Sequence, residues 1–156
     1  MTLIVGETSY VDVATASTYL ADHIDGAAWT AASDEQKAAA LVSATRAIDR
    51  LPLRGAPVDA DQHLAFPRRE RTGYGWSVQS AVPQAVLDAT CEEALALLDG
   101  ERRQRQQLQA EGVASFSLGA LSESYRAGAT GSANDGVVSQ AARQLLRPYI
   151  ARTFRL

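Results

Sequence analysis

Arginine and aromatic residues lie close together in one stretch of the chain, and this combination is its best candidate for binding chemistry. The candidate residues are Arg68, Arg69, Arg71, Tyr74 and Trp76. Proteins that bind single-stranded nucleic acid combine positive charge with aromatic faces on which bases stack. The competing interpretation is a loop held in place by its own aromatic side chains, with the arginines in water or in ion pairs. Because the chain has a formal net charge of −3, we favour the competing interpretation for this stretch.

Catalytic and metal-binding patterns are not found in the sequence. His23 and His63 lie far apart in unrelated contexts, and Cys91 is the single cysteine, so the spacing of a zinc site is not present. Glu92 and Glu93 are adjacent on a predicted helix and cannot face each other. We expect both glutamates on the solvated surface. The sequence therefore predicts no enzyme, no catalytic residue, no metal and no cofactor.

The stretch from residue 82 to residue 111 is predicted to be the helix around which the fold is built. Pro83 suits the first turn of a helix, where a missing N–H costs nothing. Apolar residues then recur at helical spacing on one face, at Leu87, Cys91, Ala94, Leu95 and Leu98. After Gly100 the apolar face ends although helix-forming residues continue. We expect one helix, or two in line, with a buried first half and a second half that faces solvent or a partner.

Two earlier helices are predicted from their capping residues. Asp12 is a suitable N-cap for a first helix. Ser33 and Gln36 have the spacing of a capping box, and the helix that they begin is expected to end at Pro52. The following segment, 54–81, is predicted to be irregular. A loop of this length is either functional or ordered by the packing of its aromatic residues.

The last third of the chain predicts a hairpin, a linker and a short helix. Residues 113–126 alternate around Gly119-Ala120, which fits a two-residue turn. We therefore expect a mainly α fold in a single domain, a small bundle of about four helices with a β-hairpin and an extended C-terminal tail. Its parts are a helical body (9–111), the hairpin (113–126), a flexible linker (128–136) and a C-terminal helix and tail (137–156).

Several motifs resemble a group of tailed-phage and prophage proteins. They are Tyr10-Val-Asp-Val-Ala, Leu64-Ala-Phe-Pro-Arg, Val82-Pro-Gln-Ala-Val and Ser115-Phe-Ser-Leu-Gly-Ala-Leu-Ser-Glu-Ser-Tyr. Proteins of this group are labelled DnaT-like single-stranded DNA-binding proteins. They are similar to the head–tail connectors (adaptors, or head-completion proteins) of long-tailed phages. The resemblance spans nearly the whole chain.

This resemblance implies a structural virion protein in the neck, assembled in the host bacterial cytoplasm. Such connectors form a ring of identical subunits, typically a dodecamer, beneath the portal protein. The ring extends the DNA channel, lets DNA pass without specific binding, contacts no membrane and is the platform for the tail-side completion or terminator protein. By analogy, intersubunit or tail-side contacts would come from Val113, Phe116, Leu118, Leu121 and Tyr125. Portal docking would use Arg143, Arg147, Tyr149, Arg152, Phe154 and Arg155.

The alternative function takes the label of the group literally. It is a single-stranded DNA-binding replication protein whose contacts are Arg68, Arg69, Arg71, Tyr74 and Trp76. This alternative predicts oligonucleotide binding that weakens as salt is added.

Overall fold

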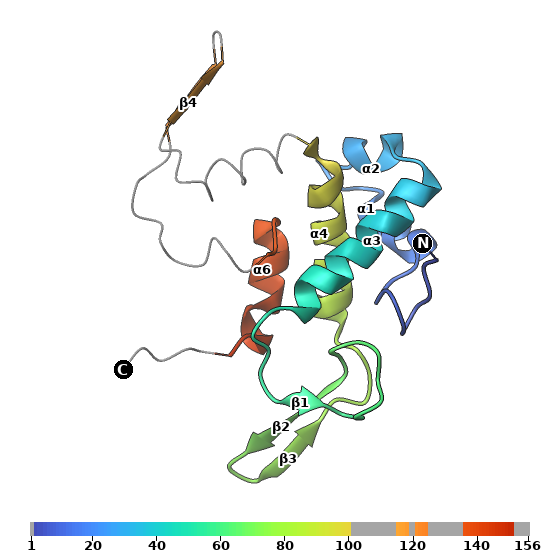
Figure 1. Ribbon diagram of the computed structural model, residues 1–156, viewed down its shortest axis with the longest axis vertical. Coiled ribbons are helices and arrows are strands. Elements are labelled where there is room, and N and C mark those ends of the chain that lie inside the picture. Colours follow the sequence, from blue (N-terminus) through green and yellow to red (C-terminus); the bar gives the residue numbers. More distant parts are fainter. Residues whose placement is uncertain (1, 101–114, 119–120, 125–135, 152–156) are drawn as a thin grey trace.

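The computed structural model of the chain describes residues 2–100, 115–118, 121–124 and 136–151. It is mainly α-helical with two small antiparallel sheets, which confirms the predicted fold class (Figure 1). The helices are α1 (Val13–Leu20), α2 (Ala27–Ala31), α3 (Asp34–Asp49), α4 (Gln84–Leu98), α6 (Gln140–Leu146) and the 3-10 turn η1 (Arg147–Tyr149). The strands are β1 (Ala56–Pro57), β2 (Arg68–Thr72), β3 (Gly75–Val78), β4 (Ser115–Leu118) and β5 (Leu121–Ser124).

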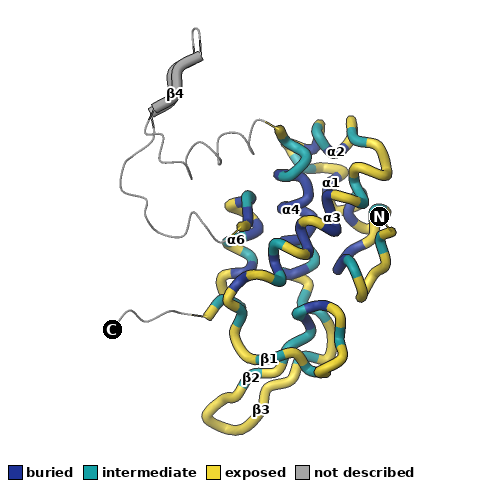
Figure 2. The backbone as a smooth tube through the Cα atoms, viewed as in Figure 1, coloured by how far each residue is buried: buried dark blue, intermediate teal, exposed yellow. Residues whose placement is uncertain are grey.

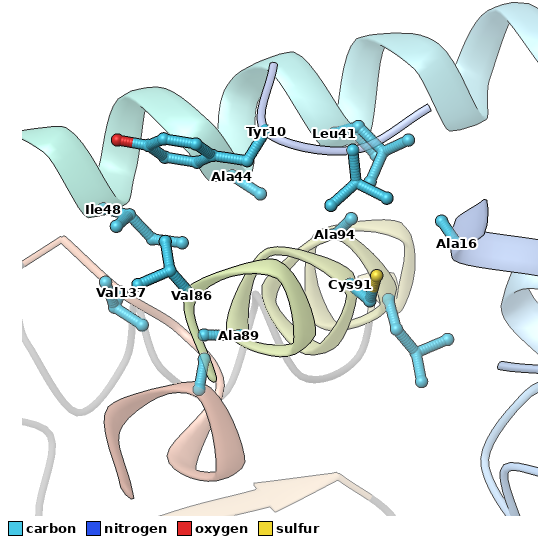
Figure 3. Close-up of a cluster of buried hydrophobic side chains, with 14 of the residues drawn as sticks. Tyr10, Ala16, Leu41, Ala44, Ile48, Val86, Ala89, Cys91, Ala94 and Val137 are labelled. Carbon is cyan, nitrogen blue, oxygen red and sulfur yellow. The ribbon is translucent and has the colours of Figure 1, made fainter. Parts of the chain in front are cut away.

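Helix α4 forms the centre of the helical body, as the sequence predicts, and packs against both α3 and α6 (Figure 1). Pro83 is its N-cap, and the Pro83 carbonyl accepts the N–H groups of Val86 and Leu87. Small residues bring α3 and α4 together, since Ala44 on α3 and Ala94 on α4 are both fully buried (Figure 3). The core therefore combines this close helix–helix contact with larger buried side chains, among them Leu41, Ile48, Leu95 and Leu146.

The starts of α1 and α3 confirm the predicted caps. The carboxylate of Asp12 accepts the N–H of Thr15 at 2.6 Å. Ser33 and Gln36 form the complete capping box, with each side chain accepting the backbone N–H of the other residue. These contacts satisfy N–H groups that have no partner within the helix. Such contacts are local, so the sequence alone predicts them.

The predicted solvent exposure of Glu92 and Glu93 is wrong, because both residues are buried. The exposed fraction of Glu93 is 0%. Its carboxylate accepts the backbone N–H groups of Val138 and Ser139 at 2.8 and 2.7 Å, just before α6. Glu92 accepts a hydrogen bond from the hydroxyl of Tyr19 on α1 at 3.2 Å. Neighbouring elements cover α4 on several sides, so its polar positions find partners inside the protein instead of water.

One prediction for the first half of the chain is also wrong, and one helix was not predicted. Residues 27–31 form this additional helix, α2, which buries Trp29. The segment 54–81, expected as irregular, contains the antiparallel sheet β1–β2–β3. Strand β2 reads Arg-Arg-Glu-Arg-Thr, which has no apolar alternation because most of this sheet is exposed to water (Figure 2).

The predicted hairpin at 113–126 is confirmed in its paired part. Strands β4 and β5 are antiparallel, with Phe116 opposite Glu123 and Leu118 opposite Leu121. The rest of that hairpin lies outside the described residues, as do the continuation of the central helix after Gly100, residues 128–135 of the linker and the tail from residue 152. Within the described part of the chain, no helix is long and apolar enough to cross a membrane.

Candidate nucleic-acid interface

The β2–β3 hairpin lies beyond the helical body at one end of the molecule (Figures 1 and 2). In its antiparallel register Arg71 is opposite Trp76, and Arg69 is opposite Val78. Because side chains alternate between the two faces of a strand, these four residues share one face. All four are exposed. The hairpin therefore presents two arginines beside an indole ring on a single accessible surface.

Four residues of this hairpin form what we call the stacking strip: Arg69, Arg71, Tyr74 and Trp76. The guanidinium carbon of Arg69 lies 5.5 Å from the centre of the Trp76 ring, within range of a cation–π contact. The Trp76 side chain nevertheless remains 64% exposed, and Tyr74 in the turn is fully exposed. The interpretation of this stretch as a loop held in place by its aromatic residues is therefore wrong for both rings.

The turn between the strands is closed by local hydrogen bonds. The Thr72 hydroxyl donates to the Gly75 carbonyl at 3.0 Å and accepts the Tyr74 N–H at 3.4 Å. Gly75 has a φ of 126°, a backbone conformation that only glycine adopts readily. The turn thus fixes the backbone that carries Tyr74 without burying its ring.

Arg68 lies on the opposite face of β2 and anchors the hairpin to the rest of the protein. Its guanidinium donates hydrogen bonds to four backbone carbonyls, those of Leu53, Arg54, Gly55 and Ala65, at 2.7 to 3.4 Å. Desolvation by burial lowers the pKa of Arg68. The structure therefore gives Arg68 a scaffolding position, unlike the other four candidates named from the sequence.

Gly55 allows β1 to approach β2 closely at the base of the hairpin. Its φ is +72°, and a Cβ at this position would lie 2.2 Å from the carbonyl oxygen of Arg69. Nearby, the Arg54 guanidinium pairs with the Glu70 carboxylate. Backbone approach and side-chain contacts together fix the direction in which the hairpin leaves the helical body.

A buried polar cluster lies where the chain approaches β2. The Tyr10 hydroxyl donates to the Asp49 carboxylate and accepts the Phe66 N–H at 3.2 Å. Asp49 also accepts the Ala65 N–H at 3.3 Å. Burial raises the pKa of both Tyr10 and Asp49. The Phe66 ring packs edge-on against Tyr149 with 5.5 Å between ring centres. The sequence alone does not reveal this cluster, because Tyr10 and Asp49 are far apart in the chain.

The residues proposed for portal docking have different surroundings. Arg143 donates to the Val137 carbonyl, Tyr149 packs against Phe66, and Arg147 is exposed. The other three candidates, Arg152, Phe154 and Arg155, lie outside the described residues. Of the predicted intersubunit contacts, Phe116, Leu118 and Leu121 lie on β4 and β5, whereas Val113 and Tyr125 lie outside the described residues.

Titratable groups do not gather into a metal site in the described part of the chain, where no group of three or more His, Cys, Asp or Glu residues could hold an ion. Burial raises the pKa of Cys91 to about 12. A thiol with so high a pKa is a poor nucleophile near neutral pH. Cys91 therefore has the character of a core residue.

The fold and the hairpin define a class: a small, mainly α-helical protein that carries an exposed arginine-and-aromatic hairpin. A family model described as "Putative DnaT-like ssDNA binding protein" matches residues 1–155, and the chain belongs to that family. No curated protein and no solved structure matches the chain.

Proposed function

We propose that the protein binds single-stranded DNA through the stacking strip. The observation that carries this proposal is the pairing of Arg69 with an exposed Trp76 on a hairpin that the helical body leaves uncovered. Tyr74 supplies a second accessible ring. The description of the family supports the same function.

Stacking on Trp76 and Tyr74 requires bases whose faces are accessible. Bases in a duplex are stacked on one another, whereas the bases of a single strand can lie on aromatic side chains. Each stacked base is worth about 1–3 kcal/mol, whatever its identity. Arg69 and Arg71 would neutralise phosphates next to the stacked bases. We therefore expect a preference for single strands and little dependence on sequence.

The acidic net charge does not conflict with this proposal, because charge is unevenly distributed. β2 contains three arginines and one glutamate. Arg68 and Glu70 are both engaged in contacts at the base of the hairpin, so Arg69 and Arg71 are the cations that accompany the exposed rings. A local positive surface on an acidic protein favours contact at that surface alone.

Fluorescence titration with a thymidine oligonucleotide tests the proposal. Trp76 is exposed and should be quenched by a stacked base, whereas Trp29 is 4% exposed and should contribute a constant background. Trp76→Ala and Tyr74→Ala should each weaken binding about 5- to 150-fold, as expected for the loss of one stacked base. Binding to these two variants would be followed by anisotropy of a labelled oligonucleotide.

Ile24→Ala is the matched control for those variants. Ile24 is 96% exposed and belongs to the turn after α1, outside the hairpin. Its truncation removes exposed apolar surface without touching the stacking strip, so affinity should not change. Equal loss of affinity in the control and in the hairpin variants would argue against a site on the hairpin.

The second candidate function is the head–tail connector, with a ring of copies of this chain between the portal and the tail-side completion protein. The favouring observation is an exposed strand: all four residues of β3 are exposed, including Trp76 and Val78. Exposed strands with apolar side chains pair readily with another chain. The motifs from Tyr10 to Tyr125 that resemble phage connectors support the same candidate.

Mass measurement and imaging of the protein, alone and mixed with a phage portal protein, separate the two candidates. A connector should form rings or a stoichiometric layer on the portal and should show no salt-sensitive affinity for oligonucleotides. A single-strand binder should show that affinity and should not associate with the portal.

A further inference from the structure

A small polar cleft lies at the base of the hairpin. On one side the cleft is lined by Arg54, Arg68, Arg69, Glu70, Ser77 and Gln79. On the other side the cleft is bounded by Pro148 and Tyr149. It therefore lies between η1 and the face of the β2–β3 sheet that carries Arg68 and Glu70, opposite the face that carries Arg69, Arg71 and Trp76.

Backbone pairing holds the two sides of this cleft together. The Arg54 N–H donates to the Tyr149 carbonyl at 2.8 Å, and the Ala151 N–H donates to the Pro52 carbonyl at 2.7 Å. Leu53 and Ile150 form an antiparallel bridge between them. The segment after α6 is thus attached to the chain that enters β1, so the cleft is a preformed feature of the fold.

Positive charge predominates around the cleft, since three arginines and one glutamate line it. Arg54 pairs with Glu70, but their side chains are 50% and 40% exposed. An exposed ion pair of this kind contributes little to stability. A phosphate group can therefore replace the Glu70 carboxylate as the partner of Arg54 Nη2, while Nη1 keeps its hydrogen bond to the Pro148 carbonyl at 3.3 Å. Arginine can bind phosphate through two parallel hydrogen bonds, which Nε and Nη2 would supply here.

We propose that this cleft is a phosphate-binding site, with Arg54 as its principal ligand and Glu70 as an internal competitor for the same guanidinium. The inference rests on the proposed function, because we assign the phosphate to the backbone of a DNA strand that stacks on Trp76. Arg69 belongs to both surfaces, since it lines the cleft while its guanidinium contacts the Trp76 ring on the other face of the hairpin. The DNA strand would therefore pass around the exposed edge strand β3 to reach both. Ser77 adds a neutral hydroxyl donor. Free inorganic phosphate has the same chemistry and is the other source of the ligand.

Charge substitutions at Arg54 and Glu70 test the site in oligonucleotide titrations. Arg54→Gln removes the ligand and should weaken binding about 3- to 10-fold, while lowering the slope of log affinity against log salt by about 0.7. Glu70→Gln removes the competitor and should tighten binding by a similar factor. Arg54→Lys keeps the charge without the two-pronged contact and should give an intermediate affinity. Arg46→Gln, at an exposed position of α3, is the matched control.

A second measurement distinguishes failure of this inference from failure of the proposed function. Inorganic phosphate is titrated while the side-chain Nε–H signal of Arg54 is followed by NMR, with Arg54→Gln used to assign the signal. A saturable shift of this signal supports phosphate binding in the cleft. If that shift occurs while oligonucleotides do not bind, free phosphate is the ligand and the stacking proposal fails.

The opposite pattern would overturn only the proposal that the cleft binds phosphate. Oligonucleotides would then bind through Trp76, yet affinity would be the same in Arg54→Gln, Glu70→Gln and the unsubstituted protein, and phosphate would leave the Arg54 signal unchanged. Absence of both phosphate and oligonucleotide binding would overturn both proposals. Urea unfolding of each variant separates a lost ligand contact from a lost fold.

Discussion

Tyr10 connects the helical body to the chain that leads into β2. Its hydroxyl donates to Asp49 on α3 and accepts the Phe66 N–H. Both side chains are largely buried, and burial raises the pKa of each. Because water cannot replace these partners easily, each hydrogen bond in the cluster depends on the others.

Tyr10→Phe tests the importance of this cluster. The substitution keeps the ring but removes a donor from Asp49 and an acceptor from Phe66. Leaving buried polar groups without a partner costs about 1–3 kcal/mol, and we expect a decrease of that size in the free energy of unfolding in urea. Tyr19→Phe is the control, because Tyr19 is 40% exposed and the Glu92 carboxylate keeps His23 Nε2 as a partner, at 3.4 Å, when the hydroxyl is removed. If Tyr10→Phe lowered the free energy of unfolding by less than Tyr19→Phe does, the cluster would not be what holds the hairpin in place.

Cys91 should make the stability of the folded protein fall as pH rises. Burial raises the pKa of its thiol in the folded protein to about 12, whereas an unfolded thiol ionises near pH 8.5. The folded state therefore retains a proton that the unfolded state loses, and stability should fall as pH rises above about 8.5. Unfolding of the unsubstituted protein and of Cys91→Ala should be compared at neutral pH and at about pH 10. The difference in unfolding free energy between the two proteins should shrink at the higher pH. A difference that stays constant would contradict the raised pKa.

Elements whose signals are local could be predicted from the sequence. Asp12 and the Ser33–Gln36 box mark helix starts through contacts within a few residues. The apolar face of α4 likewise repeats at helical spacing. By contrast, β2 is nearly all charged, and its strand conformation depends on pairing with β1 and β3. The burial of Glu93 depends on α6, which follows it by more than forty residues in the sequence.

The sequence predicts the candidate site only in part, and only as the site of the alternative function. The sequence placed Arg69, Arg71, Tyr74 and Trp76 close together, and proximity in the chain was enough to group them. It could not separate Arg68 from that group, because alternation between strand faces was not foreseen. Arg54 was missed for a related reason, since only the fold brings it beside Glu70.

Gly55→Ala tests the close approach of β1 and β2. The added Cβ would lie 2.2 Å from the Arg69 carbonyl oxygen, and the φ of +72° is itself unfavourable for alanine. We expect a loss of at least about 1 kcal/mol in unfolding free energy, together with weaker oligonucleotide binding. Gly73→Ala is a matched control in the same hairpin, because nothing lies within 4 Å of its added Cβ. Similar stability of the two variants would show that the sheet tolerates a wider separation.

Glu93→Gln tests how α6 is attached to α4. The carboxylate accepts two backbone N–H groups at the start of α6. An amide can accept only at its oxygen and presents a donor to the second N–H, so we expect a loss of about 1–3 kcal/mol in unfolding free energy. Hydrogen exchange in 140–146 should accelerate more than exchange in α3. Glu35→Gln, on the exposed first turn of α3, should change neither quantity appreciably.

At the scale of the whole molecule, core and binding surface are separate. Helices α3, α4 and α6 bury the apolar residues, while the β2–β3 hairpin lies at one end and is almost entirely exposed (Figure 2). Both proposed functions would use that exposed hairpin, one to bind DNA and the other to pair with a neighbouring protein chain. Salt dependence separates them, because phosphate contacts release bound counterions whereas strand pairing between proteins does not.

The most direct test of the central proposal is a titration of the protein with a single-stranded oligonucleotide and with the matching duplex, each at two salt concentrations. The stacking strip predicts quenching of Trp76 by the single strand, with a slope of log affinity against log salt of about −1.4 for two phosphate contacts. The duplex should bind more weakly, because its bases are not free to stack on the rings. Equal affinity for both nucleic acids, or no salt-dependent quenching by the single strand, would contradict the proposal that this hairpin binds single-stranded DNA.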